Sequence, residues 1–342
     1  MIQFPDPYSI VGERRIIVGK AEKRSLIDVH LHYAIPEYFD YLEKNNALFE
    51  DSILLPRKSN EEMLQMMDDS GTDLTVITLS SPQPYYQGGE EEGIKICRKL
   101  NEAAAALQRQ YPDRFRFHAV LPLPNVQAAI EEAIYALDEL GAVGIKLASN
   151  ARGQYLGDPA LDPLFQVLHD RWAIINIHPH RPDGLRDDLF SAKIIPVFEF
   201  FADTTRAVLN MMGHGIMERY HQLKIIVPHS GAFLANNADR GEEFVPLLKR
   251  LGVLQEELYV KENLSRFYYD MAGNPIPDLL PLLLRFVPAS HILYGSDYPF
   301  TPKQKSIDRV ADIRAFLDSD PKLSPYREMF FHENAERLYK FH

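Results

Sequence analysis

The sequence contains a single cysteine, Cys97, so one chain cannot form an internal disulfide. This fits a reducing compartment, and we expect a cytoplasmic location. No stretch approaches the roughly 18 apolar residues that a membrane-spanning helix needs. The most apolar stretch, Leu279–Val287, is interrupted by Pro281 and Arg285. Met1–Lys20 lacks the apolar core of a secretion signal, and we therefore expect no contact with a membrane.

Positive charge is also scarce. The chain has 37 Lys and Arg against 48 Asp and Glu, a formal net charge of −11, so we expect no nucleic-acid partner. No glycine-rich phosphate-binding loop is present, which disfavours an open doubly wound sheet. The hydrophobic content of 46% is that of a globular protein, and no low-complexity linker divides the chain. We therefore predict one domain over residues 1–342.

Short apolar segments alternate with helical patterns along most of the chain. We predict strands that begin near residues 26, 73, 115, 143, 173, 224, 267 and 291. Eight strands that alternate with helices over this length predict an α/β fold, a (β/α)8 TIM barrel. Residues 33–59, which include a predicted helix at Pro36–Asn46, are long for a barrel loop. We interpret them as a small insertion near the active site.

The first predicted strand ends in His30 and His32. Alternate residues of a strand point to the same side, so both imidazoles can face one point and supply half of a transition-metal site. Three later strands end in His178, His229 and Asp297. The carboxyl ends of barrel strands share one rim. Three histidines and an aspartate there can bind a divalent ion, and a fifth group can act as acid or base.

Two further residues leave alternatives open. His180, two residues after His178, either faces the pocket or belongs to a loop. Lys146, at the end of the fourth predicted strand, either packs its stem in the barrel with its ammonium paired or is carbamylated and bridges two metal ions. A second metal ion would favour hydrolysis of an amide, ester or lactone.

The ordered motifs of the chain resemble those of the amidohydrolase superfamily. Within amidohydrolase-related family 2 they are similar to the branch of aminocarboxymuconate-semialdehyde decarboxylase and the salicylate-type decarboxylases. The motifs are DVHLH (Asp28–His32), YLGDPALDPLF (Tyr155–Phe165), NIHPH (Asn176–His180), DTTRAVLNMM (Asp203–Met212), PHSGAF (Pro228–Phe233) and YGSDYPFTP (Tyr294–Pro302). The chain departs from the family where HSG replaces the usual HGG turn and where a histidine follows Pro179.

The resemblance assigns roles to particular residues. It implies that the metal ligands are His30, His32, His178 and Asp297 and that His229 is catalytic. It also implies that Arg240 binds the substrate carboxylate, often from a neighbouring subunit, and hence a homodimer.

The activity implied is non-oxidative decarboxylation of a small aromatic or unsaturated carboxylic acid, of the hydroxybenzoate or aminocarboxymuconate-semialdehyde type. One divalent ion per chain is expected, Zn2+ with Mn2+ as the alternative. Asp297 would donate the proton, or His229 would act as base. We expect Tyr33, Phe300 and His180 to contact the substrate. The alternative is hydrolysis by a metal-activated water.

Overall fold

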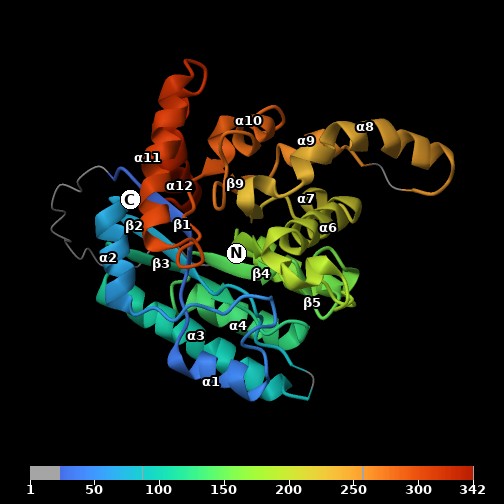
Figure 1. Cartoon of the computed structure of the whole chain (residues 1–342). Helices are drawn as coiled ribbons and strands as arrows, with labels where there is room; N and C mark the ends of the chain where they lie inside the picture. Colours follow the sequence, from blue (N-terminus) through green and yellow to red (C-terminus); the bar gives the residue numbers. More distant parts are fainter. Residues whose placement is uncertain (1–23, 87, 256–257, 342) are drawn as a thin grey trace, which may run out of the picture.

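Eight parallel strands form a barrel in the computed structural model, which describes residues 24–86, 88–255 and 258–341 (Figure 1). In sheet order the strands are β1 (Ile27–His32), β2 (Leu74–Thr78), β3 (Phe115–Val120), β4 (Gly144–Ala148), β7 (Ile174–His178), β8 (Lys224–Val227), β9 (Tyr268–Asp270) and β10 (Ile292–Leu293). Backbone hydrogen bonds from Val29 N–H to Tyr294 O (3.0 Å) and from His32 N–H to Tyr298 O (2.8 Å) join the first strand to the last segment. The predicted TIM barrel is thereby confirmed.

Helices follow the strands and surround the barrel. They are α1 (Pro36–Lys44), α2 (Asn60–Ser70), α3 (Glu90–Gln110), α4 (Val126–Asp138), α5 (Asp162–Asp170), α6 (Glu199–Gly213), α7 (Ile216–Arg219), α8 (Leu234–Arg250), α9 (Val260–Leu264), α10 (Leu279–Leu283), α11 (Lys303–Ser319) and α12 (Asn334–Tyr339). A two-stranded hairpin of β5 (Asn150–Ala151) and β6 (Gln154–Tyr155) follows β4. In the described part of the chain, no helix has the length and apolar character to cross a membrane.

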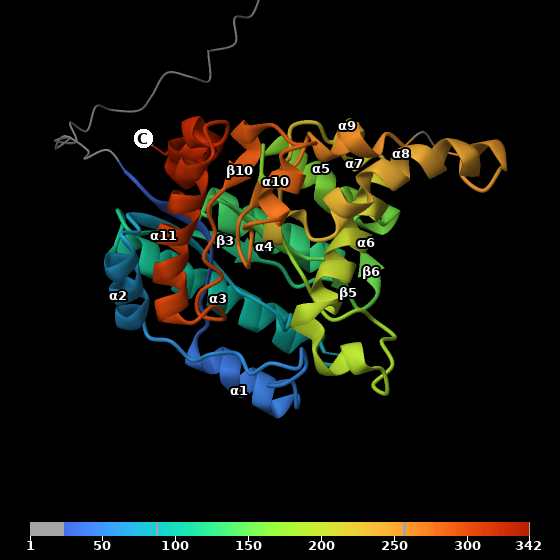
Figure 2. The ribbon, with the colours of Figure 1, turned by 45° about the horizontal axis from the view of Figure 1, so that its top comes forward.

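Two predicted helices have different bounds in the structure. The helical pattern of the sequence predicts one long helix over Ile194–Tyr220. In the structure α6 begins only at Glu199, and α6 and α7 are separate because Gly215 between them takes a φ of +62°. The sequence also predicts a helix at Glu242–Leu251, which is the second half of α8, a helix that begins at Leu234. In both views α8 projects away from the barrel (Figures 1 and 2).

The pairing register between β1 and β2 changes within β1, before the carboxyl end of the strand. The first half of the strand places Ile27 and Val29 in an apolar cluster with Leu74 and Val76 of β2. The pairing of β1 with β2 then shifts between Asp28 and Leu31. A bulge of this kind re-aims side chains, and bulges are common beside active sites. Here it separates the apolar half of β1 from the half that carries the two histidines.

Candidate metal and substrate site

Four histidines and one aspartate meet at the carboxyl end of the barrel. They are His30 and His32 of β1, His178 of β7, and His229 and Asp297 of the turns after β8 and β10. One oxygen of Asp297 lies 3.2 Å from His32 Nε2 and 3.6 Å from His30 Nε2. Ligand atoms of His30, His32 and His178 lie within 4.8 Å of one another, as do those of His30, His229 and Asp297. All five residues predicted for this rim are therefore neighbours.

The orientation of the imidazoles suits a metal ion. His30, His32 and His178 each direct Nδ1 to an oxygen outside the cluster, at 2.8 Å (Asp270), 3.4 Å (Thr78 O) and 2.9 Å (Pro179 O). Nε2 of each ring is then free to coordinate, and such outer hydrogen bonds fix the required tautomer. The Nε2 atoms of His30 and His32 are 3.1 Å apart. Two nitrogens that are each about 2.1 Å from one ion have roughly this separation. The donor set thus fits a divalent transition metal.

Asp270, at the end of β9, connects two parts of the cluster. Its Oδ2 accepts from His30 Nδ1 at 2.8 Å, and its Oδ1 accepts the backbone N–H groups of His229 and Ala272, each at 3.0 Å. The carboxylate is completely buried. Asp270 therefore fixes both the ring of His30 and the position of the turn that carries His229.

The backbone at His229 and Asp297 has an uncommon conformation. φ is +56° at His229, +53° at Ser230, +52° at Ala232 and +60° at Asp297, where residues other than glycine are strained. Such strain persists only where the surrounding structure imposes it, and it is frequent at functional sites. The strained turns direct His229 and Asp297 toward each other, with His229 Nε2 4.0 Å from Asp297 Oδ2.

The charges around His30 favour a cation at the centre of the cluster. Burial acts to lower the pKa of His30, but the charges of Asp270, Asp297 and Asp28 outweigh it and raise this pKa to about 9. Burial lowers the pKa of His32 to about 4, and a neutral imidazole is the form that binds metal. Burial works against the charge of Asp297, yet its hydrogen bond to His32 and the charges of the nearby histidines lower its pKa to about 2.

A cavity of about 430 Å³ opens onto the cluster. His178, His229 and Asp297 form part of its wall. The other described residues that line it are Asp51, Ile53, Ser80, Ser81, Pro196, Val197, Phe200, Phe201, Gly273, Asn274, Leu279 and Phe300. The Phe201 ring stacks on His229 with the centroids 5.5 Å apart. Most of the wall is apolar, and its size suits one substituted ring beside the metal cluster.

The amidohydrolase family model matches residues 27–341. The chain belongs to the amidohydrolase family. It is 30% identical over 298 residues to the 6-methylsalicylic acid decarboxylase of Penicillium expansum. The matched region covers 86% of this chain and 89% of that protein. A crystal structure of an amidohydrolase II has a TM-score of 0.85 at 32% identity, with 93% of this chain and 100% of the other covered.

A dihydroxybenzoic acid decarboxylase of Polaromonas, solved with bound manganese and the inhibitor 2-nitroresorcinol, shares the fold. Its TM-score is 0.78 at 20% identity, with 93% of this chain and 97% of that chain covered. The family predicted from the motifs is confirmed.

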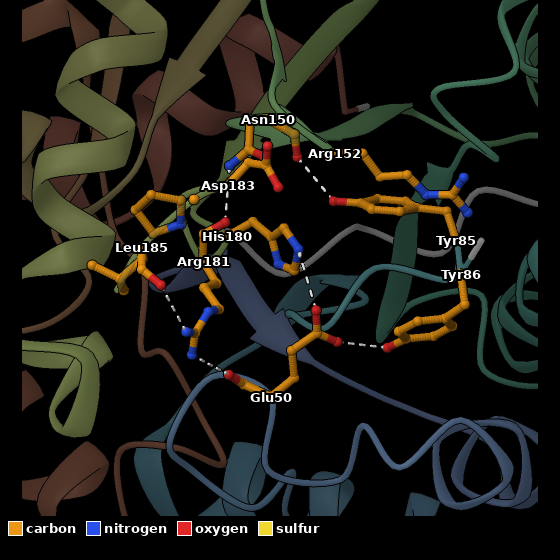
Figure 3. Close-up of a pocket in the computed structure, with 11 residues that line it drawn as sticks. Glu50, Tyr85, Tyr86, Asn150, Arg152, His180, Arg181, Asp183 and Leu185 are labelled. Atoms are coloured by element: carbon orange, nitrogen blue, oxygen red, sulfur yellow. Dashed lines mark hydrogen bonds and ion pairs between the residues drawn. The ribbon is translucent and has the colours of Figure 1, made fainter. Parts of the chain in front are cut away.

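The residues predicted to contact substrate in this amidohydrolase do not all line the cavity beside the metal cluster. Phe300 lines the cavity, with its ring edge-on to His32 at a centroid distance of 5.5 Å. His180 lies instead in an adjoining cavity of about 270 Å³, where Figure 3 shows it directed toward Glu50. Its Nδ1 is 2.6 Å from Ser81 Oγ, so Ser81 stands between His180 and the catalytic cavity.

Two of the predicted contacts lie away from the cavity. Tyr33 belongs to the hydrophobic core, and its hydroxyl donates to the carbonyl of Leu100 in α3. Tyr33 follows His32 in an extended segment, so its side chain takes the opposite side. Tyr33 therefore lies away from the cavity beside the metal cluster, and its contact with substrate stays a prediction. Arg240 is exposed on α8, where its guanidinium lies 4.3 Å from the centre of the Phe244 ring.

Lys146 is buried in the barrel beneath the cavity. Its Nζ donates to the carbonyl oxygen of Ser80 at 3.3 Å. Burial lowers its pKa to about 7, against the opposing influence of Cys97 and Asp51. The metal-binding groups found among the described residues consist of histidines and Asp297. Carbamylation of Lys146 and a second bridged ion stay a prediction.

Sequence reasoning did not single out several residues that the structure brings to the site. Asp270 ends a predicted strand, as the metal ligands do, so the same rule applied to β9 would have found it. Asp51 belongs to the connection between α1 and α2, and Phe201 belongs to the first turn of α6; no short motif marks either residue. Their positions depend on how the segments pack over the barrel.

Proposed function

We propose that this protein is a metal-dependent, non-oxidative decarboxylase of a small aromatic carboxylic acid. The observation that carries the proposal is the cluster of imidazoles and Asp297 beside a ring-sized, largely apolar cavity. The family and the 6-methylsalicylic acid decarboxylase relative support the same activity. The alternative, hydrolysis of an amide, ester or lactone, uses the same groups on a different substrate.

His30, His32, His178 and Asp297 would hold one divalent ion. When bound, the ion neutralises the substrate carboxylate and orients it together with an adjacent oxygen. Zn2+ is our expectation from the donor set, and Mn2+ is supported by the manganese present in the Polaromonas structure. Both ions suit mixed nitrogen and oxygen ligands.

In the proposed reaction the bond between the ring carbon and the carboxylate breaks, and carbon dioxide leaves without the electron pair. The ring carbon keeps that pair and takes up a proton. Asp297 is the proposed donor, since it borders the cavity and lies 4.0 Å from His229. Its pKa is low, so it has to take up one proton from solvent water before it delivers that proton to the ring carbon. His229 would position the carboxylate, or would act as base if water takes part. Phe201 and Phe300 would hold the ring and exclude bulk water.

The test begins with protein loaded separately with Zn2+ and Mn2+ and assayed for carbon dioxide from 6-methylsalicylic acid and hydroxybenzoates. We expect one ion per chain and turnover of at least one acid. His229→Ala and Asp297→Asn should lower kcat by at least about 100-fold. Asp73→Asn, which changes a carboxylate at the opposite end of β1, serves as the control. Ester or lactone hydrolysis without carbon dioxide release, lost in the same variants, would establish the hydrolase instead.

We further propose a cytoplasmic homodimer in which Arg240 reaches the substrate carboxylate of a second copy. The projecting helix α8 supports this, because it exposes Phe244, Leu247 and Leu248 beside Arg240. A mixture of Arg240→Ala and His229→Ala proteins should regain part of the activity if subunits exchange, since hybrid dimers hold one intact site. Sedimentation at concentrations used for the assay measures the mass directly, and a monomer at full activity would contradict the dimer.

A further inference from the structure

Asp51 brings a buried carboxylate to the wall of the catalytic cavity. The residue is 2% exposed. Among the described residues, no donor makes a hydrogen bond of normal geometry with either of its carboxylate oxygens. The His180 imidazole is a near neighbour, with its Nδ1 3.8 Å from Asp51 Oδ1, but that nitrogen is already 2.6 Å from Ser81 Oγ, and burial lowers the pKa of His180 to about 3, so the ring is neutral.

A carboxylate in this environment is costly for the fold. Removal of a charge from water without a hydrogen-bond partner destabilises the native state. Burial raises the pKa of Asp51 to about 7, and the charge of Glu50 adds to the increase. Hydrogen-bonding interactions with the Ser81 hydroxyl and the Arg181 backbone and the charge of Lys146 act in the opposite direction without offsetting burial. No described hydrogen bond joins Asp51 to the metal cluster. A buried carboxylate at the wall of a binding cavity, with no hydrogen bond of normal geometry from the described residues, therefore has room for a donor on the ligand.

The rest of the cavity limits what that donor is. None of the described residues that line it is a lysine or an arginine. A second carboxylate placed beside Asp51 would be repelled and would meet no lysine or arginine among the described residues of the cavity wall. A neutral hydroxyl or amino group would instead supply the missing hydrogen bond. Ser80 and Ser81, next to Asp51 in the wall, make this the polar end of an otherwise apolar cavity.

We propose that Asp51 determines substrate specificity by accepting a hydrogen bond from a hydroxyl or amino group on the ring of an aromatic monocarboxylic acid. This inference rests on the proposed decarboxylase function and extends it, because it favours hydroxylated benzoates over dicarboxylic acids. A site built to accept a substrate hydroxyl rejects the analogue that lacks it, since the buried acceptor is then unpaired.

Matched substrates test the proposal. The series consists of benzoic acids with an ortho hydroxyl and one further substituent, which is hydroxyl, methyl or carboxylate at each remaining ring position in turn. For at least one position, kcat/KM for the hydroxyl acid should exceed that for the methyl acid by roughly 10- to 100-fold. Asp51→Leu should abolish or reverse this ratio. Asp51→Asn, whose amide oxygen still accepts, should retain part of it.

Glu50→Gln is the matched control, because Glu50 is the adjacent acid and lines the neighbouring cavity instead. Its hydroxyl-to-methyl ratio should persist: loss of the Glu50 charge lowers the pKa of Asp51 and keeps the acceptor ionised, whereas Asp51→Leu removes the acceptor. The proposal is overturned if Asp51→Leu and Asp51→Asn lower kcat/KM for every acid by one common factor. It is also overturned if the wild type shows no preference at any position.

A failure of the proposed function has a different signature, because no acid would then release carbon dioxide. Calorimetric binding of the same hydroxyl and methyl compounds to the metal-loaded protein needs no turnover and still measures the preference. The wild-type preference and its loss in Asp51→Leu would support the role of Asp51 even then. Equal Kd ratios in the wild type and both Asp51 variants would refute it. Asp51→Asn, which differs least in shape, serves if Asp51→Leu does not fold.

Discussion

Replacement of Asp270 by asparagine should weaken metal binding through the tautomer of one histidine. In the wild type, Asp270 Oδ2 accepts from His30 Nδ1 at 2.8 Å, while Oδ1 accepts the backbone N–H groups of His229 and Ala272 at 3.0 Å. An asparagine that keeps both backbone bonds with its oxygen presents an NH2 group to His30. Nδ1 then has to accept, and the ring proton moves to Nε2, the atom that faces the cluster.

The expected magnitude follows from this conflict. A ligand nitrogen that carries a proton cannot coordinate, and loss of an outer hydrogen-bond partner costs about 10- to 100-fold in metal affinity. That corresponds to about 1.4–2.8 kcal/mol of binding free energy. In the alternative rotamer, the asparagine oxygen accepts from His30 Nδ1 and restores the original tautomer. The asparagine NH2 group then faces the two backbone N–H groups, which are also donors. The first arrangement therefore protonates the nitrogen that should bind the metal, and the second leaves the two backbone N–H groups without an acceptor.

Competition with a chromophoric chelator measures the affinity in wild type and Asp270→Asn. Asp73→Asn is the control, since Asp73 accepts the N–H groups of Ser25 and Leu26 at the start of β1, far from His30. We expect weaker binding in Asp270→Asn and unchanged binding in the control. Wild-type affinity in Asp270→Asn, with the variant folded, would refute the tautomer argument.

Three further substitutions probe the packing around the site. Gly295→Ala places a Cβ 2.8 Å from His30 Cβ, so it should cost about 1–3 kcal/mol of unfolding free energy and reduce metal content, as measured by urea unfolding and elemental analysis. Lys146→Met tests the buried ammonium: its folded pKa of about 7 is below the reference 10.5, so the unfolded state binds more protons between these values and wild-type stability rises with pH there. From pH 7 to 9 the rise should be about 2 kcal/mol larger in the wild type than in the variant, and an equal rise in both would contradict the pKa. Ser230→Gly relieves a φ of +53° and removes an unpaired buried hydroxyl, so thermal unfolding should show a gain of about 1 kcal/mol, and a loss would contradict the strain.

The barrel and the metal cluster were accessible from sequence because both follow from local patterns. Strand segments show as apolar runs, and the parallel barrel brings their carboxyl ends together, so His178, His229 and Asp297 were predicted as neighbours of His30 without knowledge of any contact. Successive residues of an extended segment point to opposite sides, so the side chain of Tyr33 points away from the side on which His32 faces the metal cluster.

The substrate end of the site was not accessible in the same way. Asp51 belongs to a segment without a repeating pattern, and Val197 lies in a short 3-10 turn, Ile195–Val197, where the sequence predicts a continuous helix. The positions of both residues depend on contacts between parts of the chain that are distant in sequence. Ser52 Oγ, for example, donates to the carbonyl of Ala192 at 2.7 Å. Such contacts form only after the barrel has brought the segments together, so no local rule predicts them.

That hydrogen bond between Ser52 and Ala192 affects how this enzyme can be recombined with its relatives. The strands that carry the metal ligands form one unit. The segments that contribute Asp51 and Val197 form a second unit, in which the hydrogen bond joins two residues 140 positions apart in the sequence. A chimera that receives only one of these segments loses their mutual contact and misplaces part of the cavity wall. Transfer of substrate preference between relatives should therefore require both segments in the same graft.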